Sequence, residues 1–119
     1  MGPLDATQLA LEQALAGASA RQQILANNVA NANTPGFTRS DLDFQTQLAN
    51  AIAAGPQALQ GLTFSPQKDS SGPADANGNN VDIDTEMSDM AQNALEYESI
   101  AEVVNARMKM IQTAIGNGV

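Results

Sequence analysis

The sequence predicts an all-α protein in which two long terminal helices form a coiled-coil-like hairpin or bundle around an irregular middle segment. Two observations carry this prediction. Apolar residues recur at alternating spacings of four and three near both ends of the chain, which is the helical period. All but one of the prolines and most of the glycines lie between residues 33 and 80, where they interrupt regular structure. With 119 residues, we expect one domain spanning 1–119.

Residues 5–32 are predicted to form the first helix. They are rich in Ala, Leu and Gln, which are compatible with helix. Asp5 or Thr7 can cap its start. The helix has one apolar stripe, which is interrupted by a single polar residue. It consists of Leu11, Leu15, Ala18, Gln22, Leu25, Val29 and Ala32.

Residues 33–80 are predicted to hold a turn, a short helix and a flexible loop. Pro35 suits the second position of a type II turn and Gly36 suits the third. Residues 42–53 could form the short helix. Residues 65–80 contain no bulky apolar side chain, and we expect them to be a mobile loop.

Residues 84–115 are predicted to form the second long helix, and they give the clearest signal in the chain. Acidic residues lie in its first turns and basic residues near its end, which suits the helix dipole. The stripe consists of Ile83, Met87, Met90, Ala94, Tyr97, Ala101, Val104, Met108, Ile111 and Ile115. Its methionines suit either ordinary packing or an adaptable partner surface. Both interpretations bury this face in the assembled state.

Composition excludes several classes of function. The chain has no His, Cys or Trp, so thiol nucleophiles, disulfides, Cys–His zinc sites and histidine bases are absent. We expect no catalytic residue, cofactor, metal or small-molecule substrate. The five basic residues are scattered in a chain of net charge −8, which argues against nucleic acid as a partner. Few bulky side chains remain once alanine is set aside, so we expect a core completed by other subunits.

An asparagine-rich segment ends the first helix. Asn27, Asn28, Asn31 and Asn33 lie within seven residues and are followed by the Thr34-Pro35-Gly36 turn. Asparagine competes for backbone groups and is a poor helix former, so the segment could be a frayed helix end. Four such residues before a fixed turn favour a polar recognition edge.

The run LANNVANANTPGFTRSDLDF at 25–44 resembles the N-terminal signature of the flagellar axial proteins, the rod, hook and hook-junction families. Within them it resembles most the flagellar basal-body rod protein family, closest to the proximal rod protein B group, through its Asp-x-Asp-Phe stretch. The segments NVDIDTEM at 80–87 and NALEY at 93–97 resemble the last helix of the same families. The residues carried over as an assembly motif are Asn27, Asn28, Asn31, Asn33, Thr34, Pro35, Gly36, Phe37, Asp41, Asp43 and Phe44.

The resemblance implies a self-assembling structural subunit of the proximal rod. Its partners would be other rod subunits, of its own and sister kinds, and components of the membrane ring and export gate. It would lie in the periplasmic rod of the basal body, exported without a cleaved signal peptide. The N-terminal stretch lacks a basic residue before its apolar segment, which agrees with that route. The predicted helix-seam interface is Leu11, Leu15, Leu25, Val29, Met87, Met90, Tyr97, Val104, Met108, Ile111 and Ile115.

Three alternatives stay open at this stage. A soluble helical-hairpin adaptor or chaperone would share the stripes, and a sister rod protein of similar length would share the motif. Residues 75–86 nearly match a calcium-binding loop, although Asn80 replaces its glycine and the preceding residues cannot form an entering helix. The carboxylate pairs Asp41/Asp43 and Asp82/Asp84 could work as acid and base only in an apolar pocket, which the sequence does not suggest.

Overall fold

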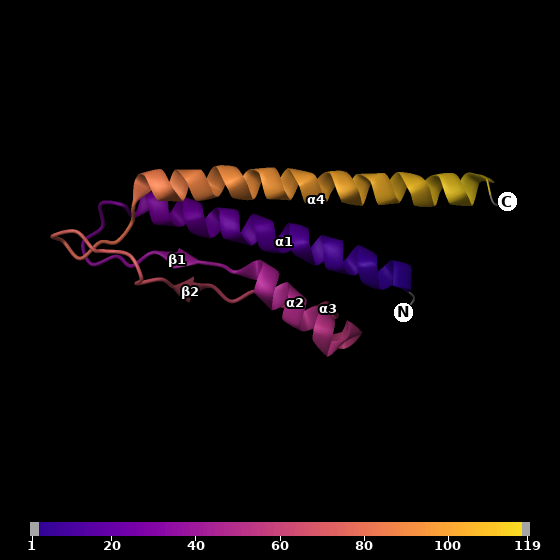
Figure 1. Cartoon of the computed structure of the whole chain (residues 1–119), viewed down its shortest axis with the longest axis horizontal. Coiled ribbons are helices and arrows are strands. Elements are labelled where there is room, and N and C mark those ends of the chain that lie inside the picture. The colour runs from indigo at the N-terminus through magenta and orange to yellow at the C-terminus, as the bar shows by residue number, and fades with distance from the viewer. Residues whose placement is uncertain (1–2, 118–119) are drawn as a thin grey trace.

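Two long antiparallel helices run side by side in the computed structural model, which describes residues 3–117 (Figure 1). They are α1 (Pro3–Ala30) and α4 (Ile83–Asn117). Between them lie β1 (Ser40–Asp41), α2 (Phe44–Ala54), α3 (Pro56–Gln60) and β2 (Gln67–Lys68). The prediction of a mostly helical hairpin with an irregular middle is confirmed. The two long helices each differ from their predicted bounds by one or two residues at either end.

The molecule is elongated. It measures 67 × 27 × 15 Å and has a radius of gyration of 18.0 Å, whereas a compact domain of this length has about 13–14 Å. α2 and α3 form a short arm beside α1, on the side away from α4 (Figure 1). None of the helices described is long and apolar enough to cross a membrane.

Local sequence explains where the helices begin. Pro3 occupies the first position of α1, where its missing N–H is not needed. The Asp82 carboxylate accepts hydrogen bonds from the backbone N–H groups of Asp84 (3.1 Å) and Thr85 (3.4 Å) and so caps α4. The Asp43 carboxylate caps α2 by accepting from the N–H of Thr46 (3.2 Å), which is why that helix begins at 44 rather than at the predicted 42.

The turn after α1 has the predicted geometry. The N–H of Phe37 donates to the carbonyl of Thr34 (3.2 Å), and Gly36 has a φ of +73°, which is the left-handed value that the third position of a type II turn requires. The N–H of Gly36 also donates to the carbonyl of Asn77 (2.8 Å). This bond joins the turn to the distant loop at 65–80.

The middle segment contains more regular structure than predicted. β1 and β2 pair antiparallel, with Ser40 opposite Lys68, and Gly55 at a φ of +117° allows the additional helix α3 to follow α2 directly. The loop at 65–80 is joined to the rest of the chain by backbone bonds such as Asp69 N–H to the carbonyl of Arg39 (2.9 Å). Its mobility stays a prediction.

The apolar core is small and lies between α1 and α2. It consists of Ala18, Leu42 and Phe44, each at most 1% exposed. The ring of Phe64 meets Phe44 edge-on, with centroids 6.3 Å apart. Among the described residues, the seam between the two long helices has no comparable cluster of large buried side chains, so polar contacts become important there.

Candidate assembly surface

A cluster of charged side chains holds the end of the hairpin where α1 finishes and α4 starts. The Arg39 guanidinium contacts Asp69 (2.6 Å), Asp41 (3.3 Å) and, most closely, Glu86. Glu86 lies in the first turn of α4 and is 1% exposed. Because removal of one partner of a buried ion pair leaves the other charge uncompensated, Arg39 ties the chain after the turn firmly to α4.

Asn28 connects three elements from inside this cluster. Its side chain is fully buried, and its amide nitrogen donates to the carbonyl of Ser40 (2.7 Å) and to the Glu86 carboxylate (3.2 Å). Its amide oxygen accepts from the N–H of Ser40 (3.0 Å). One buried amide therefore joins α1, β1 and α4, and all of its principal hydrogen-bonding groups are satisfied.

Arg21, Arg39 and Asp41 stay ionised near neutral pH. The hydrogen bond to Glu86 raises the pKa of Arg39, and the hydrogen bond to Asp41 (2.8 Å) raises the pKa of Arg21. Burial alone would raise the pKa of Asp41, but hydrogen bonds from Arg21, the Leu42 N–H and Arg39 outweigh it and lower that pKa. With Arg21 and Arg39 held charged and Asp41 ionised, the arrangement suits a structural clamp rather than proton transfer.

The asparagine-rich end of α1 is fastened by the distant loop. The side-chain nitrogen of Asn79 donates to the carbonyls of Asn31 and Thr34, both at 2.8 Å. Asn31 in turn donates to the carbonyl of Asn27 (2.8 Å) and accepts from the Thr34 hydroxyl (3.1 Å). The segment is thus a hydrogen-bonded cap on the helix rather than a frayed end.

The structure divides the predicted assembly motif into inward and outward residues. Asn28 and Phe44 are buried, Asp41 belongs to the ion cluster and Asp43 caps α2. These four residues therefore make their contacts within the subunit. Asn31 and Phe37 are half-buried. The residues exposed to solvent are Asn27, Asn33, Thr34, Pro35 and Gly36. A role of the motif in assembly stays a prediction, and the outward set is the part available for it.

The predicted helix-seam residues are divided in the same way. Leu25 is buried, and the half-buried members are Leu11, Leu15, Val29, Met90, Val104 and Ile111. The exposed members are Met87 (53% exposed), Tyr97 (41%), Met108 (43%) and Ile115 (64%). We call the strip of α4 formed by Ile83, Met87, Ala94, Ala101, Met108 and Ile115 the open column. It follows a seven-residue repeat from Met87 onward, and the subunit by itself leaves most of its large side chains uncovered.

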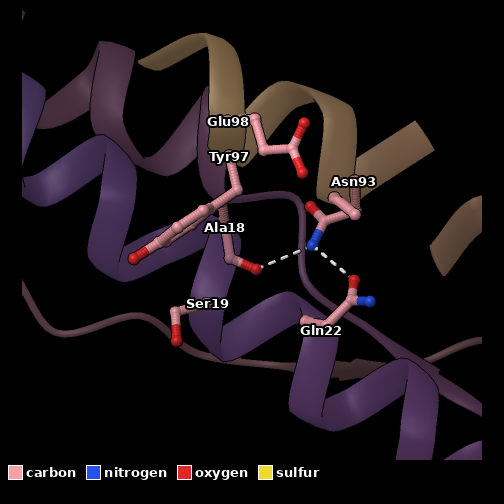
Figure 2. A pocket seen from close by; sticks show the side chains of 7 residues that line it. Ala18, Ser19, Gln22, Asn93, Tyr97 and Glu98 are labelled. Carbon is pink, nitrogen blue, oxygen red and sulfur yellow. Dashed lines mark hydrogen bonds between the residues drawn. The ribbon is translucent and has the colours of Figure 1, made fainter. Parts of the chain in front are cut away.

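The face of α4 that turns toward α1 is partly polar. Asn93 is 1% exposed, and its amide nitrogen donates to the carbonyl of Ala18 (2.7 Å) and to the side-chain oxygen of Gln22 (2.8 Å) (Figure 2). Glu86 lies seven residues earlier on the same face. Hydrogen bonds at these two positions set the axial register of α4 relative to α1.

The sequence interpretation missed Arg21, Arg39, Glu86 and Asn93 as organising residues. One signal was available, because Glu86 and Asn93 share a seven-residue spacing directly beside the apolar stripe. Nothing in the sequence indicates which acidic residues Arg39 would meet, since Glu86 is 47 positions away.

Two carboxylates of the calcium-loop alternative already have partners within the chain. The Asp75 carboxylate accepts from the N–H groups of Asn77 (2.8 Å) and Asn79 (3.1 Å), while Glu86 pairs with Arg39. Within residues 3–117, no group of three or more His, Cys, Asp or Glu side chains could hold a metal ion.

Fold and surface together define a class of protein. An elongated two-helix hairpin with a small core, an ionic clamp at one end and an apolar column open to solvent has the features of an assembly subunit, because exposed apolar strips of this kind are typical of contacts with other chains.

Comparison with known proteins identifies the family. The family model described as flagella basal body rod protein matches residues 9–38, which cover most of α1 and the turn after it. The chain is 31% identical to the flagellar basal body rod protein FlgB of Bacillus subtilis, over 91% of this chain and 92% of that protein. It is 30% identical to FlgB of Salmonella typhimurium and 28% identical to FlgB of Escherichia coli, in both cases over 97% of this chain and 96% of the relative. The chain belongs to the flagellar basal body rod protein family.

Proposed function

We propose that this chain is a structural subunit of the proximal rod of the flagellar basal body and that it assembles through its two terminal helices. The observation that carries the proposal is the open column on α4, whose large side chains are 43–64% exposed in the single subunit. Its partners would be further copies, sister rod proteins and components of the membrane ring and export gate. Export would proceed without a cleaved signal peptide, and the assembled rod would transmit torque.

The energetics favour contacts with several neighbours. Full burial of a Met or Ile side chain stabilises by about 1.5–3 kcal/mol, so a half-exposed one contributes about 1 kcal/mol on docking. The open column has four large exposed residues, and a second exposed set lies off that strip, consisting of Leu95, Val103 and Met110. The open column alone would supply about 4 kcal/mol, which only matches the lower end of the cost of association at about 4 kcal/mol. Both sets together would supply about 7 kcal/mol. Unclosed contacts of this heterologous kind build a helical tube.

The test uses Met87→Asp in the source bacterium, with Ala91→Asp as the matched control. Both positions are exposed and lie one turn apart on α4, but only Met87 belongs to the open column. Val104 and Ile111 are less suitable, because they are half-buried in the hairpin itself and a charge there would disturb the subunit. Circular dichroism of the purified variants checks the fold, and swimming in soft agar checks assembly.

We expect Met87→Asp to fold and to be exported normally but to abolish swimming, while Ala91→Asp swims. Normal swimming with Met87→Asp would remove the open column from the assembly interface. The adaptor alternative predicts a chain that stays monomeric or dimeric in sedimentation experiments at micromolar concentration, with no growth into larger assemblies.

A further inference from the structure

A hollow of about 360 Å³ opens between α1 and α4 at the middle of the hairpin (Figure 2). We call it the Asn93 notch. The residues that matter for its chemistry are Ala18 on α1 and Asn93, Ala94, Tyr97 and Glu98 on α4. The two alanines leave the space, since larger side chains in their place would fill it.

Asn93 presents an acceptor without a donor. Its amide nitrogen is committed to the carbonyl of Ala18 and to the side-chain oxygen of Gln22. Because the Ala18 carbonyl can only accept a hydrogen bond, it requires the amide nitrogen of Asn93 on that side, which fixes the orientation of the amide. The Asn93 Oδ1 atom is buried and receives no hydrogen bond from the described residues. A buried acceptor left in this state is unfavourable, and a donor entering the notch would satisfy it.

The surroundings favour a positively charged donor. The Tyr97 ring forms one wall, and the Glu98 carboxylate lies beside Asn93 at the rim (Figure 2). The Glu98 side chain is exposed, and its carboxylate has no hydrogen bond or ion pair within the part of the chain that the structure describes. An amide oxygen, a carboxylate and an aromatic ring together match a lysine or arginine head group, and the flanking alanines match its aliphatic stem.

We propose that the Asn93 notch receives the lysine or arginine side chain of a neighbouring rod subunit. This inference rests on the proposed function, and it adds the chemistry of one contact. Ala94 lines the notch and belongs also to the open column, so a helix lying along that column brings its side chains directly over the notch.

Two variants alter the notch by different means, each with a matched control on α4. Ala94→Leu fills the hollow, and its control Ala91→Leu adds the same bulk at an exposed position outside it. Glu98→Lys places a like charge at the rim, and its control Glu102→Lys makes the same change at an exposed position one turn away. Each variant gene replaces the natural gene in the source bacterium. The thermal unfolding of each purified chain is followed by circular dichroism.

We expect all four chains to fold, with melting temperatures within about 4 °C of the natural chain because surface changes have small effects. Ala94→Leu and Glu98→Lys should each reduce the number of swimming cells by at least about tenfold, as expected when a desolvated charged contact is lost, and both controls should swim normally. If Ala94→Leu does not fold, the exposed change Glu98→Lys decides alone.

Normal swimming with Glu98→Lys, or equal loss in variants and controls, would overturn the notch contact. Met87→Asp separates this failure from failure of the proposed function. If that variant stops swimming while both notch variants swim, the open column assembles the rod and the notch takes no part. If all three swim, neither the open column nor the notch takes part in assembly, and the proposed assembly through this face of α4 fails as well.

Discussion

Gly17→Ala is the sharpest stability prediction that the structure makes. Alanine in place of glycine inside a helix normally stabilises by about 1 kcal/mol. At Gly17 we expect the opposite sign, because a Cβ atom there would lie 2.7 Å from the Cβ, Cγ and Cδ2 atoms of Phe44. Carbon atoms pack best at about 3.5–4.0 Å, so three atoms would overlap by about 1 Å.

The magnitude follows from how little Phe44 can move. Its side chain is 1% exposed and is held by Leu42, Ala18 and Phe64, so the overlap must be relieved by separating α2 from α1. Overpacking of this kind costs about 1–3 kcal/mol. Because the overlap involves three atoms of a confined side chain, we take the upper half of that range and subtract the helix gain. We expect the free energy of unfolding to fall by about 1–2 kcal/mol.

The assay is urea unfolding of the purified chain followed by circular dichroism. Gly116→Ala is the control, since a Cβ atom at that position of α4 meets nothing within 4 Å, and we expect it to be neutral or slightly stabilising. A double-mutant cycle with Phe44→Leu adds a second readout, because the smaller side chain should recover part of the loss. If Gly17→Ala is as stable as the natural chain, or more stable, the close contact of α1 and α2 through Phe44 is wrong.

Two further predictions concern the ion cluster. Arg39→Lys should lower the free energy of unfolding by about 1–3 kcal/mol in the same urea assay, because a single ammonium cannot replace a fork that reaches Glu86, Asp41 and Asp69 at once; a lysine variant as stable as the natural chain would contradict this. Asp41 has a pKa below its ordinary 3.8 in the folded chain, so its contribution to stability is present above that value and is lost as the pH falls through the lower folded value. In the Asp41→Asn variant the free energy of unfolding should therefore fall less steeply below about pH 4 than in the natural chain. Urea unfolding at a series of pH values measures this, and an equally steep fall in both chains would show that Asp41 contributes nothing.

The sequence was sufficient for elements whose causes are local. The spacing of Met87 and Met108 with their neighbours is a helical period, and Pro35-Gly36 has few other conformations available, so the long helices and the turn could be predicted. The partner of each face could not, because periodicity does not say whether an apolar stripe faces α1 or another chain. Asn93 turns inward although it is polar, and Met87 stays outside although it is apolar. The Arg39–Glu86 pair joins residues far apart in the sequence, and only the packed hairpin selects it.

Two polar connections between the long helices have a mechanical consequence. Asn28 with Glu86, and Asn93 with the Ala18 carbonyl, lie seven residues apart along α4, which is about 10 Å. A shift of one helical turn would break both at once and leave a carboxylate and an amide facing apolar surface. Sliding of the two helices along the hairpin axis is therefore resisted by these hydrogen bonds as well as by apolar packing.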